Sequence, residues 1–289
     1  MGKIKSQSLR SRIRKYEEVS NIRLVSGLPV VIRLDGKAFH TFTKGFKKPF
    51  DDIISRCMQK AMLEVCSEAQ NCVMGYTQSD EITLVLCDYL NDDATGWFDN
   101  RLEKLVATTA SDATLAFFRQ LNREYINYDR ELIERGRKSH EEFLKVRQDG
   151  SVEYIENIAD ALERKINFDS RAFNIPEYEI ANVFIDRQVD AERNSIQMLA
   201  QSVIGKKQIT GISNKKLQDK MFTEYGVNWN DIPTKFKRGS CCIKVPTEVK
   251  PGVIREKWTI DNEIPVFTAN REYILSRFQR KDKKKEETA

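Results

Sequence analysis

Residues 30–36 read VVIRLDG, and residues 78–86 read QSDEITLVL. In each stretch an apolar, β-branched run adjoins carboxylates. The first run ends at Asp35, and the second begins after Asp80 and Glu81. β-branched residues favour strands, and Gly36 permits a sharp turn after the first run. If the two runs are neighbouring strands, the three acidic side chains meet at one edge of a sheet. Clustered carboxylates repel one another unless a hard cation lies between them, so the pattern predicts a Mg²⁺ site.

Two hypotheses remain open for these carboxylates. In palm-type nucleotidyltransferases, two Mg²⁺ ions about 3.5–4 Å apart clamp the attacking and leaving oxygens of a phosphoryl transfer. Asp35 and Asp80 would then bridge the metals, and Gly36 would add its carbonyl oxygen. Glu81 could ligate, orient a ligand or pair with a Lys. Alternatively, Asp35 and Asp80 are turn residues whose carboxylates accept hydrogen bonds from backbone N–H groups.

The composition indicates one large domain, or one domain with an appended piece. The chain has 289 residues, of which 40% are hydrophobic and 31% charged. It has no run of about 18 apolar residues, so no membrane span is expected, and no secretory signal is expected either. The six cysteines form no CxxC pair. They lie mostly inside apolar patterns, so buried free thiols in a reducing cytoplasm are predicted, rather than a zinc site.

The charge balance permits a polyanionic partner without requiring one. Lys plus Arg number 48 and Asp plus Glu number 43, which gives a net charge of +5. Basic residues cluster at 10–15 and at 280–285. These clusters either contact nucleic acid or form a solvated helix face and a frayed tail.

The spacing of apolar residues predicts an α+β fold, because some runs suit strands and others recur every three or four residues. Expected strands cover residues 30–34, 72–76, 82–87, 172–175 and 241–245, with a small hairpin at 258–267. Expected helices cover residues 8–19, 53–66, 97–118, 182–204 and 215–224. The short turn between strands 72–76 and 82–87 makes this pair antiparallel.

The first part of this element order fits a ferredoxin-like polymerase palm, with helices over one face of an antiparallel sheet. Residues 122–165 are dense in charge, which predicts an inserted helical arm whose folding depends on local pairs or a partner chain. We therefore predict a palm-type catalytic domain at 1–245, with the insertion at about 122–165. A C-terminal extension at 246–289 would carry the hairpin and a basic tail, and residues 281–289 are predicted to be disordered.

Basic side chains flank the predicted metal site. Arg33 points to the face of its strand opposite its neighbours. Arg101 and Lys104, spaced i, i+3, share a helix face that suits a triphosphate. The lysines that follow the Gly36 turn are Lys37, Lys44, Lys47 and Lys48. Each alone could be ordinary surface charge, but together they suggest a phosphate-binding funnel. His40 lies among aromatic residues and is either a buried, satisfied histidine or a base contact.

Several ordered motifs resemble the tRNA-His guanylyltransferase family. They are IRLDGKAFH at 32–40, KP at 48–49, GYTQSDE at 75–81, FDNRLEK at 98–104, FDSR at 168–171, RQVD at 187–190 and KRGS at 237–240. The resemblance covers about residues 15–245, apart from the charged arm. It implies an α+β palm that adds nucleotides to the 5′ end of a tRNA, in the reverse of the usual polymerase direction. ATP would first activate a 5′-monophosphate, and the 3′-hydroxyl of an incoming nucleoside triphosphate such as GTP would then attack that end.

The resemblance also implies roles for individual residues. Asp35, Asp80 and Glu81 would be catalytic, with two Mg²⁺ ions held by Asp35, Gly36 and Asp80. The nucleotide and triphosphate would contact Arg33, Lys37, Ala38, Phe39, His40, Lys48, Ser79, Arg101 and Lys104. The tRNA would contact Arg187, Asn194, Lys215, Lys237 and Arg238. The family further implies a homotetramer, arranged as a dimer of dimers.

One departure from the family pattern bears on the substrate. Eukaryotic members that act on tRNA-His carry a His-Ile-Asn-Asn segment after Arg-Gln-x-Asp, and here Glu192 stands where that His would fall. The variant resembles the bacterial, archaeal and phage-type relatives, which repair 5′-truncated tRNAs by templated addition. Templated repair is the first hypothesis, and addition of a single G to tRNA-His is the alternative. A nucleotide cyclase with a related palm and a non-enzymatic RNA-binding protein are the other classes.

Overall fold

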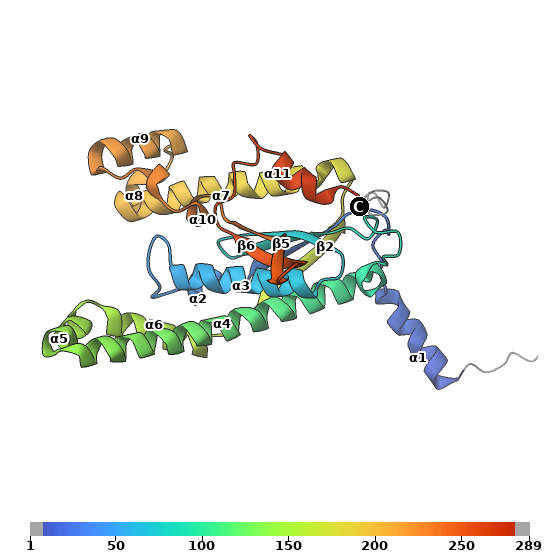
Figure 1. Ribbon diagram of the computed structural model, residues 1–289, viewed down its shortest axis with the longest axis horizontal. Helices are drawn as coiled ribbons and strands as arrows, with labels where there is room; N and C mark the ends of the chain where they lie inside the picture. The colour runs from blue at the N-terminus through green and yellow to red at the C-terminus, as the bar shows by residue number, and fades with distance from the viewer. Residues whose placement is uncertain (1–7, 281–289) are drawn as a thin grey trace, which may run out of the picture.

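An antiparallel six-stranded sheet carries the fold, and the computed structural model describes residues 8–280 (Figure 1). The strand order is β4-β1-β3-β2-β5-β6. The strands are β1 (Val30–Gly36), β2 (Cys72–Gln78), β3 (Glu81–Leu86), β4 (Phe168–Asn174), β5 (Ser240–Lys250) and β6 (Val253–Asp261). The predicted α+β class is confirmed.

Helices connect and cover these strands. They are α1 (Leu9–Glu17), α2 (Phe39–Phe42), α3 (Asp52–Glu68), α4 (Leu102–Lys138), α5 (His140–Gln148), α6 (Ser151–Glu163), α7 (Ile180–Val203), α8 (Lys206–Ile209), α9 (Asn214–Tyr225), α10 (Thr234–Lys237) and α11 (Glu272–Leu275). Short 3₁₀ turns are η1 (Glu18–Ser20), η2 (Trp97–Asn100), η3 (Glu177–Glu179), η4 (Trp229–Asp231) and η5 (Ser276–Phe278). The elements β1-α3-β2-β3-α4-β4, with strands in the order β4-β1-β3-β2, form the β-α-β-β-α-β arrangement.

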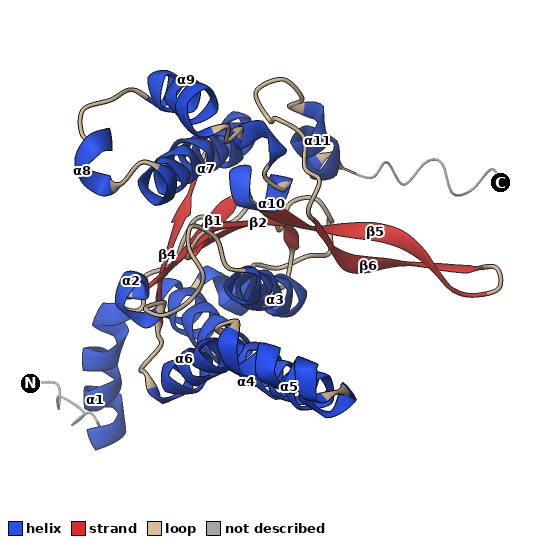
Figure 2. Cartoon of the chain, turned by 90° about the vertical axis from the view of Figure 1, so that its left-hand side faces the viewer, coloured by secondary structure: helices blue, strands red, loops and turns tan. Residues whose placement is uncertain are grey.

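Helices cover both faces of the sheet. Successive side chains of a strand point to opposite faces, so Ile32 and Leu34 pack against α3 and α4, whereas Val31 packs in a second core with Phe184 of α7. Figure 2 shows α3, α4 and α6 on one side of the sheet and α7, α9 and α11 on the other. The expectation of helices on one face therefore holds for the first part of the chain, where α3 and α4 share a face. Helix α7 covers the other face, because β1 is apolar on both sides and each side needs a cover.

The C-terminal hairpin consists of β5 and β6, and it turns at residues 251–252, where Gly252 has φ +75°. The predicted hairpin at 258–267 was wrong, because residues 253–261 are one strand. Only residues 240–242 of β5 pair with β2, so the rest of β5 and β6 projects as a two-stranded ribbon (Figure 2). The predicted domain boundary between residues 245 and 246 falls inside β5. Exposed and half-buried side chains alternate along this strand up to residue 250.

Residues 122–165 pack against the core of the chain and continue one of its helices. Helix α4 runs unbroken from Leu102 to Lys138, so the predicted helix at 97–118 and the start of the arm are one element. Helices α5 and α6 then fold back along α4 (Figure 1). Tyr154, Ile158 and Ala161 of α6 are buried in the same core as β1 and α3, and Tyr154 Oη donates to Asp51 Oδ2 at 2.6 Å. The arm thus packs on its own chain.

Three further expectations concern membrane spans, the cysteines and the end of the chain. Within residues 8–280, no helix has the length and apolar character needed to cross a membrane. All six cysteines are free and buried, as predicted. The predicted disordered segment at 281–289 lies outside the described residues, as does the basic cluster at 280–285 except for Arg280.

An ion pair between α3 and α4 should make stability depend on pH. Arg56 Nε and Nη2 donate to the two oxygens of Glu124 at 2.8 and 2.7 Å. Burial raises the pKa of Glu124, but the hydrogen bonds from Arg56 and Gln120 outweigh burial and the net pKa is lowered. A carboxylate with a lowered folded-state pKa stabilises the fold at pH values above its ordinary pKa. This stabilisation is lost as the pH falls through the folded-state pKa. Glu124→Gln should therefore cost about 1–2 kcal/mol at pH 7.

Thermal or urea unfolding of Glu124→Gln at pH 7 and at decreasing pH measures this contribution. The difference from the wild type should narrow below about pH 4, where the unfolded carboxyl is already protonated. Glu134→Gln, at an exposed position of the same helix, is the matched control. A stability difference that stays constant down to pH 3 would show that the ion pair does not carry it.

Candidate active site

The predicted carboxylates meet at one end of the sheet. β1 lies between β3 and β4, and Asp35 is directly opposite Glu81 on one side and Asp169 on the other. The Gly36 N–H donates to the carbonyl of Asp80 at 3.0 Å, which ties the end of β1 to the β2–β3 turn. The runs at residues 30–36 and 81–86 are therefore neighbouring strands, as expected.

Burial and mutual repulsion raise the pKa values of the two aspartates. For Asp35 the causes are desolvation and then the charges of Asp80, Glu81 and Asp169. For Asp80, desolvation raises the pKa more than the bond from Ser79 lowers it. Ionised carboxylates held together in this way are stabilised by an added cation. Oxygen donors of this kind suit Mg²⁺, so the residues present fit the predicted metal.

The donor set available to such a cation is small. Within residues 8–280, no group of three or more His, Cys, Asp or Glu side chains is arranged to hold a metal. Asp35, Asp80 and the Gly36 carbonyl remain as the candidate protein ligands. Glu81 is engaged elsewhere, because Arg187 Nη1 donates to its Oε2 at 3.0 Å. Of the three roles left open for Glu81, pairing with a cation is the one the structure records, and the partner is Arg rather than Lys.

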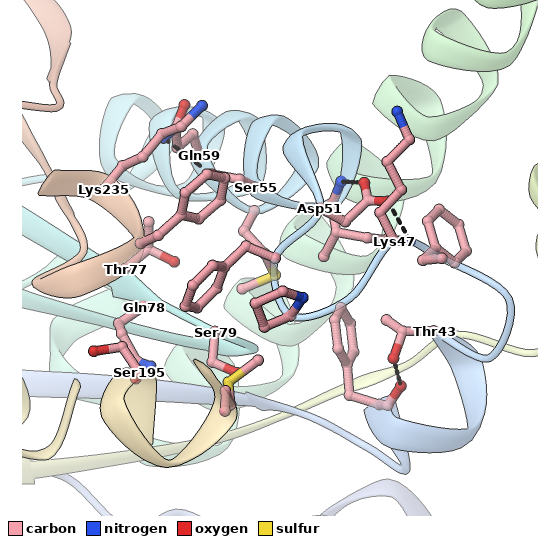
Figure 3. A pocket seen from close by; sticks show the side chains of 18 of the residues that line it. Thr43, Lys47, Asp51, Ser55, Gln59, Thr77, Gln78, Ser79, Ser195 and Lys235 are labelled. Carbon is pink, nitrogen blue, oxygen red and sulfur yellow. Dashed lines mark hydrogen bonds between the residues drawn. The ribbon is translucent and has the colours of Figure 1, made fainter. Parts of the chain in front are cut away.

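A pocket opens beside this carboxylate cluster, between α3, the end of β2, α7 and α10 (Figure 3). It encloses about 800 Å³, part of which is open to solvent. Ser79 lines it and donates to Asp80 Oδ1 at 2.8 Å, so the pocket and the cluster share a wall. The predicted nucleotide residues Phe39 and Lys48 line it as well.

Aromatic and basic side chains dominate the mouth of the pocket. The rings of Phe50 and Phe236 stack with centroids 5.0 Å apart and planes 14° apart. Lys235 lies over the Phe236 ring and forms an ion pair with Asp52. Lys47 also lines this pocket and lies over the ring of Tyr154. Flat rings beside ammonium groups can hold a nucleobase and its phosphates.

Polar groups form the inner wall of the pocket. Gln59 Nε2 donates to Ser240 Oγ at 3.0 Å and to Asn262 Oδ1 at 2.8 Å, which joins α3 to β5 and the loop after β6. Gln59, Phe50 and Phe236 were not predicted from the sequence as residues of the site. Only the adjacent lysines hinted at residues 50 and 236, which lie far apart in the chain.

The other predicted nucleotide residues lie around the cluster in different settings. Lys37, Ala38 and His40 are exposed after the Gly36 turn, and Ala38 adopts the left-handed conformation at φ 53°. His40 is therefore not the buried alternative. Arg33 Nε is buried without a hydrogen-bond partner, and desolvation followed by the charge of Arg187 lowers the Arg33 pKa.

Arg101 and Lys104 are not brought to the carboxylates. The N–H of Leu24 bonds to the carbonyl of Asn100, and Val25 bonds to the side chain of Asn174, which pairs with Val30 at the far end of β1. Helix α4 starts there and reaches the Asp35 end only near Thr114, whose hydroxyl accepts from the Phe168 N–H at 3.1 Å. Ten residues of helix span about 15 Å, so Arg101 and Lys104 lie away from the carboxylate cluster of the same chain. Their contact with a triphosphate or with the 5′ end stays a prediction.

The predicted tRNA contacts divide into exposed and engaged side chains. Lys215 on α9 is exposed. Asn194 donates to Asp190 at 3.2 Å, and Arg238 Nε donates to Glu192 at 2.8 Å.

Two of the predicted tRNA residues are enclosed by their own chain. Lys237 is only 8% exposed, burial lowers its pKa, and its Nζ donates to the Asn230 carbonyl at 2.5 Å. The Arg187 side chain is 16% exposed and held by carboxylates. Each of these two side chains has an internal partner that the sequence could not show, and their contact with tRNA stays a prediction.

Gly36 should tolerate no side chain. A Cβ atom there would lie 2.5 Å from the Phe39 ring and 3.1 Å from the Asp80 Cβ. Gly36→Ala should therefore shift Asp80 and lower the kcat of the reaction at this carboxylate cluster by about 10- to 100-fold, while circular dichroism stays unchanged. Gly136→Ala on α4, where the nearest atom would be 3.8 Å away, is the control and should keep full activity. Near-normal kcat in Gly36→Ala would contradict the placement of Asp80 at the reacting atoms.

Comparison with known proteins agrees with this geometry. A family model described as tRNAHis guanylyltransferase matches residues 10–176. A bacterial tRNA(His) guanylyltransferase-like protein solved in complex with ATP has a TM-score of 0.76 and 31% identity, over 95% of this chain and 100% of that chain. A structure of such a protein with GTP has a TM-score of 0.71 and 31% identity, over 94% and 99%. An uncharacterized protein of Acanthamoeba polyphaga mimivirus is 25% identical over 253 residues, 83% of this chain and 78% of its own length. The chain belongs to the tRNA-His guanylyltransferase family, whose members are nucleotidyltransferases that add nucleotides to tRNA in the 3′–5′ direction.

Proposed function

We propose that this protein repairs the 5′ end of tRNA by template-dependent 3′–5′ nucleotide addition. ATP would activate a 5′-monophosphate, and a nucleoside triphosphate would then be joined to that end. The observation that carries the proposal is the shared wall of the Asp35–Asp80 cluster and the aromatic, lysine-lined pocket. In this proposal the part of the sheet formed by β1 to β4 acts as a ferredoxin-like palm.

The chain's own residues suggest how the substrates are held. Phe50 and Phe236 offer ring faces to a nucleobase, and Lys47 and Lys48 offer ammonium groups to its phosphates. Stacking accepts every base, because each has a π face. The pocket could therefore take ATP for activation and other nucleotides for addition. GTP and ATP are the ligands named for the similar bacterial structures.

Asp35, Asp80 and the Gly36 carbonyl would hold Mg²⁺. Two bound Mg²⁺ ions stabilise charge on the attacking and leaving oxygens of an in-line phosphoryl transfer. Ser79 orients Asp80 through its 2.8 Å hydrogen bond. Arg33, whose Nε has no partner, faces the α7 side of the sheet beside Glu81 and can donate to a phosphate oxygen. Lys37 and His40 are exposed at the same edge and could contact the RNA terminus.

The position of Glu192 supports templated repair over a tRNA-His-specific reaction. Glu192 forms an ion pair with Arg238, so the position where eukaryotic members carry His is negatively charged and occupied. A carboxylate repels RNA phosphates and does not replace a neutral or cationic imidazole as a donor. Watson–Crick pairing with the opposite strand would then supply the specificity that the protein lacks.

Assembly and location form part of the same proposal. Helix α1 has no buried residues and exposes Leu9, Ile13 and Tyr16 along one side. This unpartnered stripe supports a homotetramer, a dimer of dimers, which light scattering of the purified protein would measure. The six free thiols support a cytoplasmic location.

An extension assay tests the proposed function. The protein is given Mg²⁺, ATP, all four nucleoside triphosphates and a 3′-labelled tRNA that lacks its first 5′ nucleotide and carries a 5′-monophosphate. We expect products lengthened at the 5′ end, with addition dependent on ATP. A 5′-triphosphate substrate should bypass the need for ATP. Addition of one G only, and only to tRNA-His, would instead establish the alternative reaction.

A further inference from the structure

Arg187 contacts the acidic cluster from the side covered by α7. Its Nη1 lies 3.0 Å from Glu81 Oε2 and 3.7 Å from Asp190 Oδ2, and its Nη2 lies 2.6 Å from Asp186 Oδ2. Its side chain is 16% exposed, whereas that of Asp186 is 65% exposed. A guanidinium fixed by three carboxylates is held in one orientation, because its planar donors cannot rotate independently.

Glu81 is the partner closest to the reaction centre. It follows Asp80 in sequence and lies opposite Asp35 across the β1–β3 pair. Left free, its carboxylate would add a further negative charge and another ligand to the Asp35–Asp80 cluster. In the structure one of its oxygens already accepts from Arg187, and the charges of Glu81 and Arg187 offset each other.

We propose that Arg187 is a positioning residue: its guanidinium holds the Glu81 carboxylate beside the Asp35–Asp80 cluster but outside its metal-binding set, and cancels the charge of Glu81 there. This inference rests on the proposed function, because it assumes that Asp35 and Asp80 bind the metal. In this arrangement Glu81 lies at the end of the sheet beside the cluster but forms its ion pair with Arg187 of α7.

Mn²⁺ affinity of the full chain tests the inference without RNA or nucleotide. Calorimetric titration with Mn²⁺ compares the wild type with Arg187→Gln, Glu81→Gln and the double variant. Removing Arg187 should tighten Mn²⁺ binding about fivefold, and removing Glu81 alone should weaken it to a similar degree, because a unit charge changes in each case. The double variant, in which both charges are gone, should bind Mn²⁺ within about twofold of the wild type.

The double variant decides between the two roles of Glu81. If Glu81 were a metal ligand, the double variant would bind Mn²⁺ about tenfold or more weakly, and the inference would be overturned. Unchanged affinity in Arg187→Gln would overturn it as well. Arg187→Lys keeps the charge and should bind Mn²⁺ like the wild type, which covers the case that Arg187→Gln folds poorly.

Two controls separate this inference from the proposed function. Arg193→Gln removes an exposed arginine of the same helix that pairs with Asp190 only through its Nη2, and it should leave Mn²⁺ affinity unchanged. Asp35→Asn should lose Mn²⁺ binding. If Asp35→Asn still binds Mn²⁺ like the wild type, Asp35 is not a metal ligand. The metal site of the proposed function would then be wrong, whatever the Arg187 variants show.

Discussion

Asp35→Asn and Asp80→Asn should each lower 5′ nucleotide addition by about 10³-fold or more, because each removes a charge that the transition state needs. The same substitutions should raise thermal stability at pH 7 in the absence of divalent cations. Burial and neighbouring carboxylates raise the pKa of both groups. A raised folded-state pKa means that the ionised form is disfavoured in the folded protein, so the cost is present at neutral pH and disappears as pH falls below the ordinary value. Extension assays and thermal melts in EDTA measure the two effects.

Asp169→Asn is the matched control for these variants. Asp169 also lies opposite Asp35, but its side chain is 60% exposed and lies 3.8 Å from Arg171. It should keep addition within about threefold of the wild type, since exposed ion pairs contribute little. Near-normal addition by Asp35→Asn or Asp80→Asn would remove the metal-dependent mechanism. Melting temperatures below that of the wild type in EDTA would contradict the electrostatic account of the cluster.

Phe236→Ala should raise KM for the nucleoside triphosphate about 10- to 100-fold, because base–aromatic stacking contributes about 1–3 kcal/mol per base. The Phe50 ring stacks on Phe236 at the mouth of the pocket, so Phe50→Ala should act in the same direction. Steady-state kinetics at saturating RNA measures KM and kcat separately. The loss should fall mainly on KM, since the ring touches the nucleotide rather than the reacting phosphate.

Phe222→Ala provides the comparison for that result. Phe222 lies on α9 with 61% of its surface exposed, and it does not line the pocket. Its substitution should leave KM unchanged. An unchanged KM in Phe236→Ala and Phe50→Ala would move the nucleobase away from the stacked pair and leave the pocket without its proposed ligand.

The sequence predicted the carboxylate edge because strands have a period of two and end abruptly at charged residues. Once residues 30–36 and 81–86 are neighbouring antiparallel strands, Asp35 at the end of one and Glu81 at the start of the other fall at the same end of the sheet. Burial of the cysteines followed from the same apolar patterns. Local patterns therefore predicted the carboxylate cluster and most of the sheet.

Long-range features could not be predicted in this way. The i, i+3 spacing of Arg101 and Lys104 predicts a shared helix face, but Arg101 precedes α4 with an extended backbone, and the spacing does not show at which end of the sheet α4 begins. Phe50, just before α3, and Phe236, in α10, meet only in the folded chain, which no local pattern records. Lys237 reads as a surface cation until its Nζ is seen to donate to the Asn230 carbonyl. Charge is visible in a sequence, whereas the partner that satisfies it is set by the fold.

In templated repair the base on the opposite strand chooses the added nucleotide. Four 5′-truncated tRNAs, identical except for the base that faces the missing 5′ nucleotide, measure this choice when each is offered all four nucleoside triphosphates with Mg²⁺ and ATP. We expect the added nucleotide to change with that base and to be its Watson–Crick complement in each RNA. Addition of G to all four RNAs, whatever base it faces, would show that the enzyme does not use the opposite strand as a template.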